Sequence, residues 1–340
     1  MSKDKYYSLN QLQPIRTSNQ RMIDARNQPN IKQLCSMFWH TNEVHILFAD
    51  TGLGKSILAV AISDALSKGE QVLGLENENE PQAVLYYDFE LSDRQFRKRY
   101  SDENGTEYEF SQLFCIDTID FASLSNLDPD AKFEDLLFEK IITDVQTLDA
   151  KVLIIDNLTY LNSQSTQDTQ IALTVMRKLN ELKKDYNLSI LVLAHTPKKT
   201  VYTPFSVTDL AGSKHLSNFA DSVSAIGKSR MNPNYRYWKQ VKCRNGEMIY
   251  DTDNVILCEL RKDDNFLGFH FITHANEYDH LKQEILDSKA PDKLDEVSEL
   301  LSQGLTYDQI ASQLKISKGT ITKWKKKYPD LFVSVSAVSE

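Results

Sequence analysis

Short apolar segments alternate with amphipathic segments between about residues 41 and 221. The apolar segments have the length of strands, and the stretches between them repeat their apolar positions with helical spacing. We expect strands at residues 44–48, 83–89, 113–116, 152–155 and 190–194. We expect helices at residues 55–68, 93–100, 133–148 and 169–185. Because buried strands separated by helices are typical of parallel sheets, this pattern predicts an α/β fold with a mostly parallel central sheet.

The two ends of the chain have different patterns. Residues 31–39 show weak helical patterning within an N-terminal segment, residues 1–40, which is a candidate subunit contact. After residue 221 strands are expected at 222–226, 237–243, 255–259 and 269–272, and they predict antiparallel strands that extend the sheet. The resulting division of the chain is an α/β domain at 41–275, a linker at 276–292, a small all-α unit at 293–330 and a flexible tail at 331–340.

Composition restricts the class of protein. The chain has 340 residues and a formal net charge of −9, which argues against a protein coated in nucleic acid over its whole surface. No apolar run approaches the ~20 residues of a membrane-spanning helix, and the first residues show no apolar signal-peptide region. The four cysteines are widely spaced and form no CxxC pair, as in the core of a protein from a reducing compartment. We therefore expect a cytoplasmic protein with no membrane partner.

A phosphate-binding loop is expected after the first strand of the domain. The stretch ILFADTGLGKS ends in Gly54-Lys55-Ser56, and it matches G-x-x-x-x-G-K-[ST] except that Ala49 replaces the first glycine. A strand, a small-residue loop and a helix follow one another here, which points backbone N–H groups and the positive helix end at a phosphate. The alternative is a glycine-rich surface turn. The candidate nucleotide-binding residues are Ala49, Asp50, Thr51, Gly52, Leu53, Gly54, Lys55, Ser56 and Ile57.

Two acidic strand ends complete the candidate ATP site. Asp156 ends the apolar strand KVLIID, and with Ser56 it would bind Mg²⁺. Glu90 ends the strand VLYYDFE, where open α/β sheets place their ligands, and it would activate the attacking water. Asp88 competes for that role, and helix capping or a surface ion pair is the structural alternative for either residue.

The order of these elements resembles that of RecA-type ATPases. The segments YYDFELSDRQFRKR, VLIIDNLTYL and LVLAHTPK follow the phosphate loop in the order of that family, over roughly residues 41–272. The chain is most similar to the RepA-like and DnaB-like hexameric helicases of plasmids and phages. The resemblance implies that Glu90 activates water and that His195 senses the γ-phosphate and relays its loss to a DNA-binding loop. It also implies a homo-oligomer, most simply a hexameric ring.

A second match concerns the segment VKCRNG, residues 241–246, which resembles the K-x-R-N-G element of DnaB-type helicases. The resemblance implies that Lys242 and Arg244 reach into the ATP site of a neighbouring subunit. A guanidinium beside the γ-phosphate would stabilise charge in the transition state. The alternative is a basic hairpin strand with an Asn-Gly turn.

Two regions are candidates for DNA contact. The loop at residues 196–212 carries Lys198 and Lys199, and in a ring it would face single-stranded DNA in the central channel. A lid without DNA contact is the alternative for this loop.

The segment at residues 294–329 resembles a helix-turn-helix, in which Thr306 and Gln309 form a capping box. Six lysines and no acidic residue lie between Gln309 and Pro329. The alternative is a helical module that binds protein. The candidate duplex contacts are Lys318, Thr320, Thr322, Lys323 and Lys326.

Together these features predict a Mg²⁺-dependent ATPase that acts on DNA, with helicase activity in the replication or mobilisation of a plasmid or other mobile element. A first alternative is an ATP-switched adaptor or loader that binds DNA without unwinding it. A second is a DNA-binding regulator that binds nucleotide without turning it over.

Overall fold

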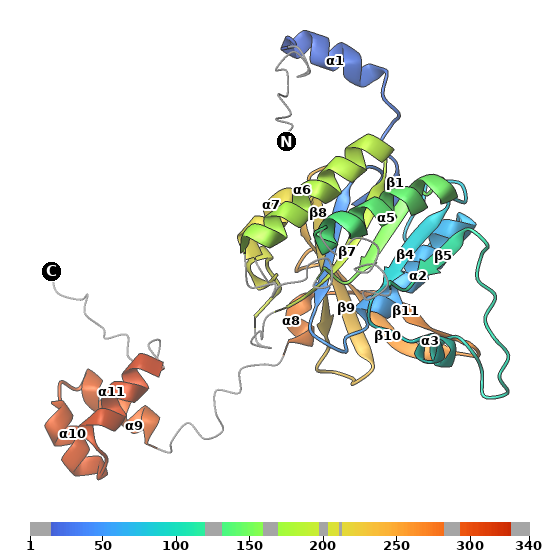
Figure 1. The fold of residues 1–340 in the computed structure, drawn as a ribbon. Helices are drawn as coiled ribbons and strands as arrows, with labels where there is room; N and C mark the ends of the chain where they lie inside the picture. Colours follow the sequence, from blue (N-terminus) through green and yellow to red (C-terminus); the bar gives the residue numbers. More distant parts are fainter. Residues whose placement is uncertain are drawn as a thin grey trace. The chain divides into compact units, whose positions relative to one another are not determined.

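The structure is a computed structural model, and it describes residues 15–119, 131–158, 169–196, 203–210, 213–281 and 293–327. The chain divides into two compact units, residues 1–281 and 282–340, which we describe separately (Figure 1). Within the described ranges, no helix is long and apolar enough to cross a membrane.

The first unit is built on a sheet that, in the described part of the chain, has nine strands in the order β11-β10-β9-β8-β3-β7-β6-β4-β5. Strands β3 to β8 run parallel to one another, and β9 to β11 extend the sheet from β8 in antiparallel pairs, so the predicted mixed sheet is confirmed. The strand bounds are β3 (Val44–Ala49), β4 (Val84–Asp88), β5 (Phe114–Asp117), β6 (Val152–Asp156), β7 (Ser189–His195), β8 (Ser222–Lys228), β9 (Tyr235–Lys242), β10 (Val255–Asp263) and β11 (Phe266–Ala275).

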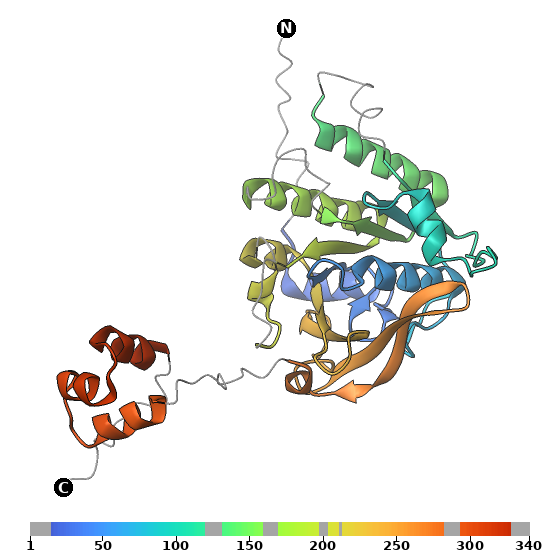
Figure 2. The ribbon, with the colours of Figure 1, turned by 90° about the horizontal axis from the view of Figure 1, so that it is seen from below.

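Helices cover both faces of this sheet because successive strand side chains point to opposite sides. In β3, Ile46 and Phe48 pack in one apolar cluster with α5 (Phe133–Leu148), α6 (Thr169–Tyr186) and α7 (Ser213–Phe219). Leu47 packs in the other cluster with α2 (Lys55–Lys68). Figure 2 shows α5 and α6 on one side of the sheet and α2 on the other. The inner parallel strands β3, β4 and β6 are therefore buried on both faces, as their continuous apolar runs predicted, whereas the edge strand β5 is only partly buried.

The N-terminal segment differs from the expectation. Residues 31–39 are not helical but form β1 (Gln33–Cys35) and β2 (Trp39–His40), which pair antiparallel. The preceding helix α1 (Ser18–Arg26) has no buried residue. Phe38 is buried and stacks on Trp238 of β9 with 3.8 Å between ring centroids. The weak helical spacing is thus overridden by tertiary packing on a strand about two hundred residues away in sequence.

The packed core also extends past residue 275, where the linker was expected. Asn276 caps the short helix α8 (Glu277–His280), and both Glu277 and His280 are buried. Glu277 forms a buried ion pair with Lys239 of β9 at 2.5 Å. A buried charge needs such a partner, so this part of the chain belongs to the folded unit.

In the described residues of the second unit, 293–327, the chain forms three helices, α9 (Leu294–Ser302), α10 (Tyr307–Leu314) and α11 (Lys318–Lys327), as expected for an all-α unit. Val297, Ile310 and Ile321 form its buried core, one residue from each helix. The Thr306–Gln309 capping box is present at the start of α10. The identification of this unit as a DNA-binding helix-turn-helix remains a prediction.

Candidate active site

Four neighbouring parallel strands end at one edge of the sheet, and their register sets the geometry there. Ala49 of β3 lies opposite His195 of β7, and Asp88 of β4 lies opposite Asp156 of β6. Because β3, β7, β6 and β4 are adjacent in this order, their carboxyl ends form a continuous edge. The structure therefore brings the phosphate loop, His195, Asp156 and the strand end before Glu90 to one place.

The loop between β3 and α2 has the backbone conformation that a phosphate cradle requires. Gly52 and Gly54 have φ angles of 76° and 97°, a region that favours glycine. Gly54 is also the N-cap of α2, and no side chain caps this helix end. A Cβ at Gly54 would lie 2.9 Å from the Phe269 ring, so the site also excludes a side chain sterically. The exposed N–H groups and the positive end of α2 are suited to an anion.

Ala49 differs from these glycines in its conformation. It is the last residue of β3, it pairs with both β7 and β8, and it is fully buried. An extended strand residue does not need glycine, so a methyl group is accommodated at this position of the motif.

Lys55 lies over the strand ends. Its Nζ donates to the carbonyl oxygens of Ala49 at 3.0 Å and Asp50 at 3.3 Å, and it lies 3.3 Å from His195 Nδ1. An ammonium can only donate, so in this contact Nδ1 is the acceptor. Burial lowers the pKa of Lys55, against the opposing effect of Asp156 and Glu90. The ammonium is thus held in a place with little water, where a phosphate would be a strong partner.

Asp156 is buried and is the candidate metal ligand. Its carboxylate accepts hydrogen bonds from the Tyr86 hydroxyl at 2.8 Å and from Ser56. Burial raises the pKa of Asp156 to about 6, and the nearby carboxylates of Asp88 and Glu90 act in the same direction. A carboxylate whose negative charge is not neutralised by a paired cation is a suitable oxygen ligand for Mg²⁺.

The protein alone offers an incomplete metal shell. In the ranges that the structure describes, no group of three or more His, Cys, Asp or Glu side chains could hold a metal ion. Mg²⁺ is commonly held by one or two protein groups together with substrate phosphates and water, so the Ser56–Asp156 pair fits a metal that arrives with a nucleotide.

Asp88 and Glu90 have different environments. Asp88 Oδ1 accepts from the backbone N–H groups of Glu90 and Leu91, both at 2.9 Å, so this carboxylate fixes the turn after β4. The Glu90 side chain is 36% exposed, and its pKa is lowered by a hydrogen bond to His195 and by the charge of Lys55. Glu90 is therefore an ionised carboxylate beside the carboxyl ends of the strands, whereas Asp88 fixes the turn that positions Glu90.

Asn157 was missed in the sequence. It is buried, its Nδ2 donates to Glu90 Oε1, and the same nitrogen lies 3.0 Å from His195 Nε2. Asn157 thus donates to the candidate base and lies beside the candidate sensor. Because a neutral imidazole has one acceptor nitrogen, His195 accepts from either Lys55 or Asn157 but not from both at once. The only signal in the sequence is its position directly after the strand-ending Asp156, which gives no indication of the direction of its side chain.

Lys242 and Arg244 are bound within their own chain. Lys242 Nζ donates to the carbonyl oxygens of Ser217 at 2.5 Å and Ala220 at 2.7 Å. Arg244 donates to the Asn218 carbonyl at 2.6 Å, and it also contacts a carboxylate oxygen of Asp221 at 3.4 Å. Both cations therefore cap the C-terminal end of α7.

This end of α7 is far from the chain's own phosphate loop along the strand direction. Asp221 bonds the first residue of β3, Val44, through backbone and side chain, whereas the phosphate loop follows the last residue of β3. The structure does not bring Lys242 and Arg244 to Lys55 of the same chain.

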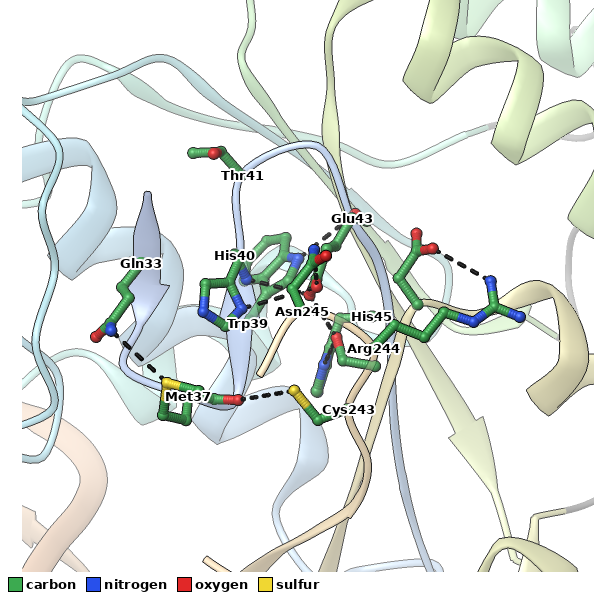
Figure 3. Close-up of polar contacts among 12 residues, drawn as sticks. Gln33, Met37, Trp39, His40, Thr41, Glu43, His45, Cys243, Arg244 and Asn245 are labelled. Carbon is green, nitrogen blue, oxygen red and sulfur yellow. Dashed lines mark hydrogen bonds and ion pairs between the residues drawn. The ribbon is translucent and has the colours of Figure 1, made fainter. Parts of the chain in front are cut away.

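The Asn-Gly turn after these residues is held against the N-terminal segment (Figure 3). Asn245 Nδ2 donates to Glu43 Oε1 at 2.6 Å, and Glu43 Oε2 accepts from the Ser222 hydroxyl at 2.7 Å and the His40 backbone at 3.2 Å. Although burial opposes it, hydrogen bonds from His40 and Ser222 hold the pKa of Glu43 below its usual value. The residues around this turn are therefore fixed by a buried carboxylate.

The predicted DNA contacts are only partly described. Lys198 and Lys199 lie outside the described residues. In the second unit, Lys318 is paired with Asp308, and the hydroxyls of Thr320 and Thr322 bond within their own helix start, to Ser317 and to the Lys318 carbonyl. Lys323 and Lys326 are exposed on α11.

A family model described as an AAA domain matches residues 11–201, more than half of the chain. The chain therefore belongs to the AAA domain family, and its class is that of a P-loop ATPase. The matched range contains the phosphate loop, Glu90, Asp156 and His195, and it ends before Lys242.

Among solved structures, the chain is similar to a KaiC-like protein from the hyperthermophilic archaeon Pyrococcus horikoshii, with 17% identity and a TM-score of 0.44. That similarity covers 69% of this chain and 91% of the archaeal chain. No curated protein matches this chain.

The raised pKa of Asp156 predicts a pH-dependent stability without nucleotide. Because an acid with a raised folded-state pKa favours its protonated form, its contribution to stability is lost as the pH rises from about 4 through about 6. Asp156→Asn should therefore raise the free energy of unfolding at pH 8 by roughly 2–3 kcal/mol and change little at pH 4. Denaturant unfolding at both pH values measures this, with the exposed Asp185→Asn as control. An equal effect of Asp156→Asn at both pH values would contradict the assignment.

Proposed function

We propose that the protein is a Mg²⁺-dependent, RecA-type ATPase that works on DNA as a homo-oligomer. The observation that supports the ATPase most strongly is the convergence of Lys55, Asp156, Glu90 and His195 at the carboxyl ends of four adjacent strands. Their charges and hydrogen bonds differ in the way that four separate roles require: Lys55 would bind phosphate, Asp156 would bind the metal, Glu90 would act as the base and His195 would act as the relay.

Each group has a role in this proposal. Lys55 and the N–H groups at the start of α2 would bind the phosphates, and Ser56 and Asp156 would hold Mg²⁺, which would neutralise charge that develops on the phosphate oxygens. Glu90 orients the attacking water and accepts its proton. Asn157 and His195 both contact the groups around Glu90, so a change at the γ-phosphate would reach the end of β7 and the loop after His195.

The DNA-directed part of the proposal rests on the resemblance to RepA-like and DnaB-like helicases and on α11. Lys323 and Lys326 are exposed there, and the earlier threonines bond within the unit. Exposed lysines suit phosphates more than base edges, so we propose duplex binding through the DNA backbone. The form of the activity that we propose is a hexameric helicase in plasmid or mobile-element replication.

Removal of the Lys55 ammonium tests the ATP site. Lys55→Ala should lower steady ATP hydrolysis by about a hundredfold or more, because the phosphate charge loses its buried partner. The rate and the particle mass should be measured with no DNA, with single-stranded DNA and with duplex DNA. The control is Lys151→Ala, an exposed lysine that pairs with Asp149. Full ATPase activity in Lys55→Ala would contradict the assignment of the ATP site.

An assay with a forked DNA duplex distinguishes a helicase from an adaptor that binds DNA without unwinding it. Release of a labelled strand that requires ATP supports the helicase form of the proposal. ATP-dependent binding to the fork without strand release would favour a loader that recruits another enzyme. Nucleotide binding without turnover would favour a regulator.

Complementation between two inactive variants tests the trans-acting arginine. To reach the ATP site of a neighbouring subunit, Arg244 would have to break its hydrogen bond to the Asn218 carbonyl of α7. If Arg244 acts in trans, its role in hydrolysis can be detected in mixed oligomers. Glu90→Gln and Arg244→Ala subunits, each inactive alone, should regain a fraction of the wild-type rate when mixed, because some interfaces combine an intact Glu90 with an intact Arg244. If mixtures of folded, assembling variants stay inactive at every ratio, the trans role is wrong and Arg244 serves only α7.

The exposed lysines of α11 predict the salt dependence of duplex binding. Lys323→Ala with Lys326→Ala should reduce the slope of log K against log salt by about 2, since each phosphate contact contributes about 0.9. Fluorescence anisotropy with an arbitrary duplex measures the slope. The control is Lys151→Ala with Lys184→Ala, two exposed lysines of the first unit. An unchanged slope would contradict DNA binding through these two lysines and would favour the alternative that the second unit binds protein.

A further inference from the structure

A pocket of about 430 Å³ lies beside the turn that carries Glu90. Its lining comes from the end of β4, from α3 (Asp93–Arg99), from residues 107–110 and from β5. Residues 49–57 of the phosphate loop do not take part in the lining. The pocket is therefore separate from the site of the phosphates, although Asp88 belongs to its wall.

Aromatic rings form the pocket's walls. Phe96 and Tyr100 have ring centroids 4.7 Å apart, Tyr100 and Phe110 5.2 Å, and Tyr108 and Phe110 4.9 Å. These rings hold one another in place, and Tyr108 is also fixed by hydrogen bonds to Asp64 and Lys68 at 2.6 Å and 2.8 Å. A preformed wall of ring faces and edges suits a flat ligand, and the volume is that of a small-molecule site.

The polar groups of the lining favour a cation. The carboxylates are those of Asp88, Asp93 and Glu107, and the one lining cation, Arg97, is paired with Glu107 at 2.6 Å. Asp88 is buried, and its Oδ1 accepts from two neutral backbone N–H groups, those of Glu90 and Leu91. The faces of aromatic rings also attract cations.

A second observation points to a missing polar partner. Tyr100, which is 2% exposed and belongs to the lining, has a hydroxyl oxygen that is buried and has no hydrogen-bond partner in the described structure. A buried hydroxyl without a partner is destabilising, and most such groups in folded proteins are satisfied. A ligand group that reached this hydroxyl from the pocket would remove the penalty.

We propose that this pocket binds a planar aromatic molecule that carries a positively charged nitrogen group, and that its occupation changes ATP turnover. The ring lies among Phe96, Tyr108 and Phe110, and the cation faces Asp88. The effect on turnover follows because Asp88 Oδ1 holds the N–H groups of Glu90 and Leu91, so a new partner for Asp88 alters the turn that aims Glu90. The regulatory half rests on the proposed ATPase function, whereas the binding half does not.

Binding is tested with benzamidine, a planar aromatic cation, and benzamide, its neutral analogue of nearly the same shape. Calorimetry on the full chain should give a Kd of about 1 mM or below for benzamidine and at least about tenfold weaker binding of benzamide. Ile116→Trp fills the pocket from β5 and should abolish the binding. Leu113→Trp is the matched control, since Leu113 is 40% exposed, Ile116 is 36% exposed, and only Ile116 lines the pocket.

Three results would overturn the binding half: no benzamidine binding, equal binding of benzamide, or unchanged binding in Ile116→Trp. The regulatory half is tested by the ATPase rate at saturating benzamidine, which should change by about fivefold in the wild type and in Leu113→Trp but not in Ile116→Trp. Benzamidine binding without a rate change would refute the coupling. Binding to a protein that hydrolyses no ATP under any condition would instead refute the proposed function and leave the pocket assignment intact.

Discussion

The parallel register of β3, β7, β6 and β4 is the constraint on which the candidate active site depends. It places Ala49 opposite His195 and Asp88 opposite Asp156. A slip of one residue would turn these side chains to the other face of the sheet, so the register must be firmly held. The two apolar clusters hold it, because alternate residues of each strand, such as Ile46 and Leu47, are buried on opposite faces. The packing of the hydrophobic core therefore sets the distances between the charged groups at the strand ends, although these groups are not part of the apolar clusters.

The same edge concentrates negative charge in a place with little water. Three carboxylates, those of Asp88, Glu90 and Asp156, influence one another's environment there, and Lys55 is close enough to act on two of them. A divalent cation offsets repulsion among the acids, while Lys55 and the start of α2 offset the charge of phosphates. The protein without nucleotide is thus electrostatically incomplete, which favours joint binding of metal and phosphate over binding of either alone.

Local pattern was enough to predict α2 and the strand-end acids, because helical spacing, buried strands and the phosphate loop are all short-range signals. The segment at 33–40 could not be predicted this way, since its packing on Trp238 is decided by a partner distant in sequence. Asn157 and Lys242 show a different limit. The sequence shows their identity, but only the fold reveals that one contacts both Glu90 and His195 and that the other caps α7.

The buried pair of Glu277 and Lys239 has a mechanical consequence. Glu277 accepts from the backbone N–H of Phe205 at 2.7 Å, and Lys239 donates to the carbonyl oxygen of the same residue at 2.9 Å. One anchor therefore holds both the segment that follows the loop after β7 and the last helix before the chain leaves the first unit. A pull on residue 205 must therefore either move α8 with it or uncover the two buried charges of Lys239 and Glu277.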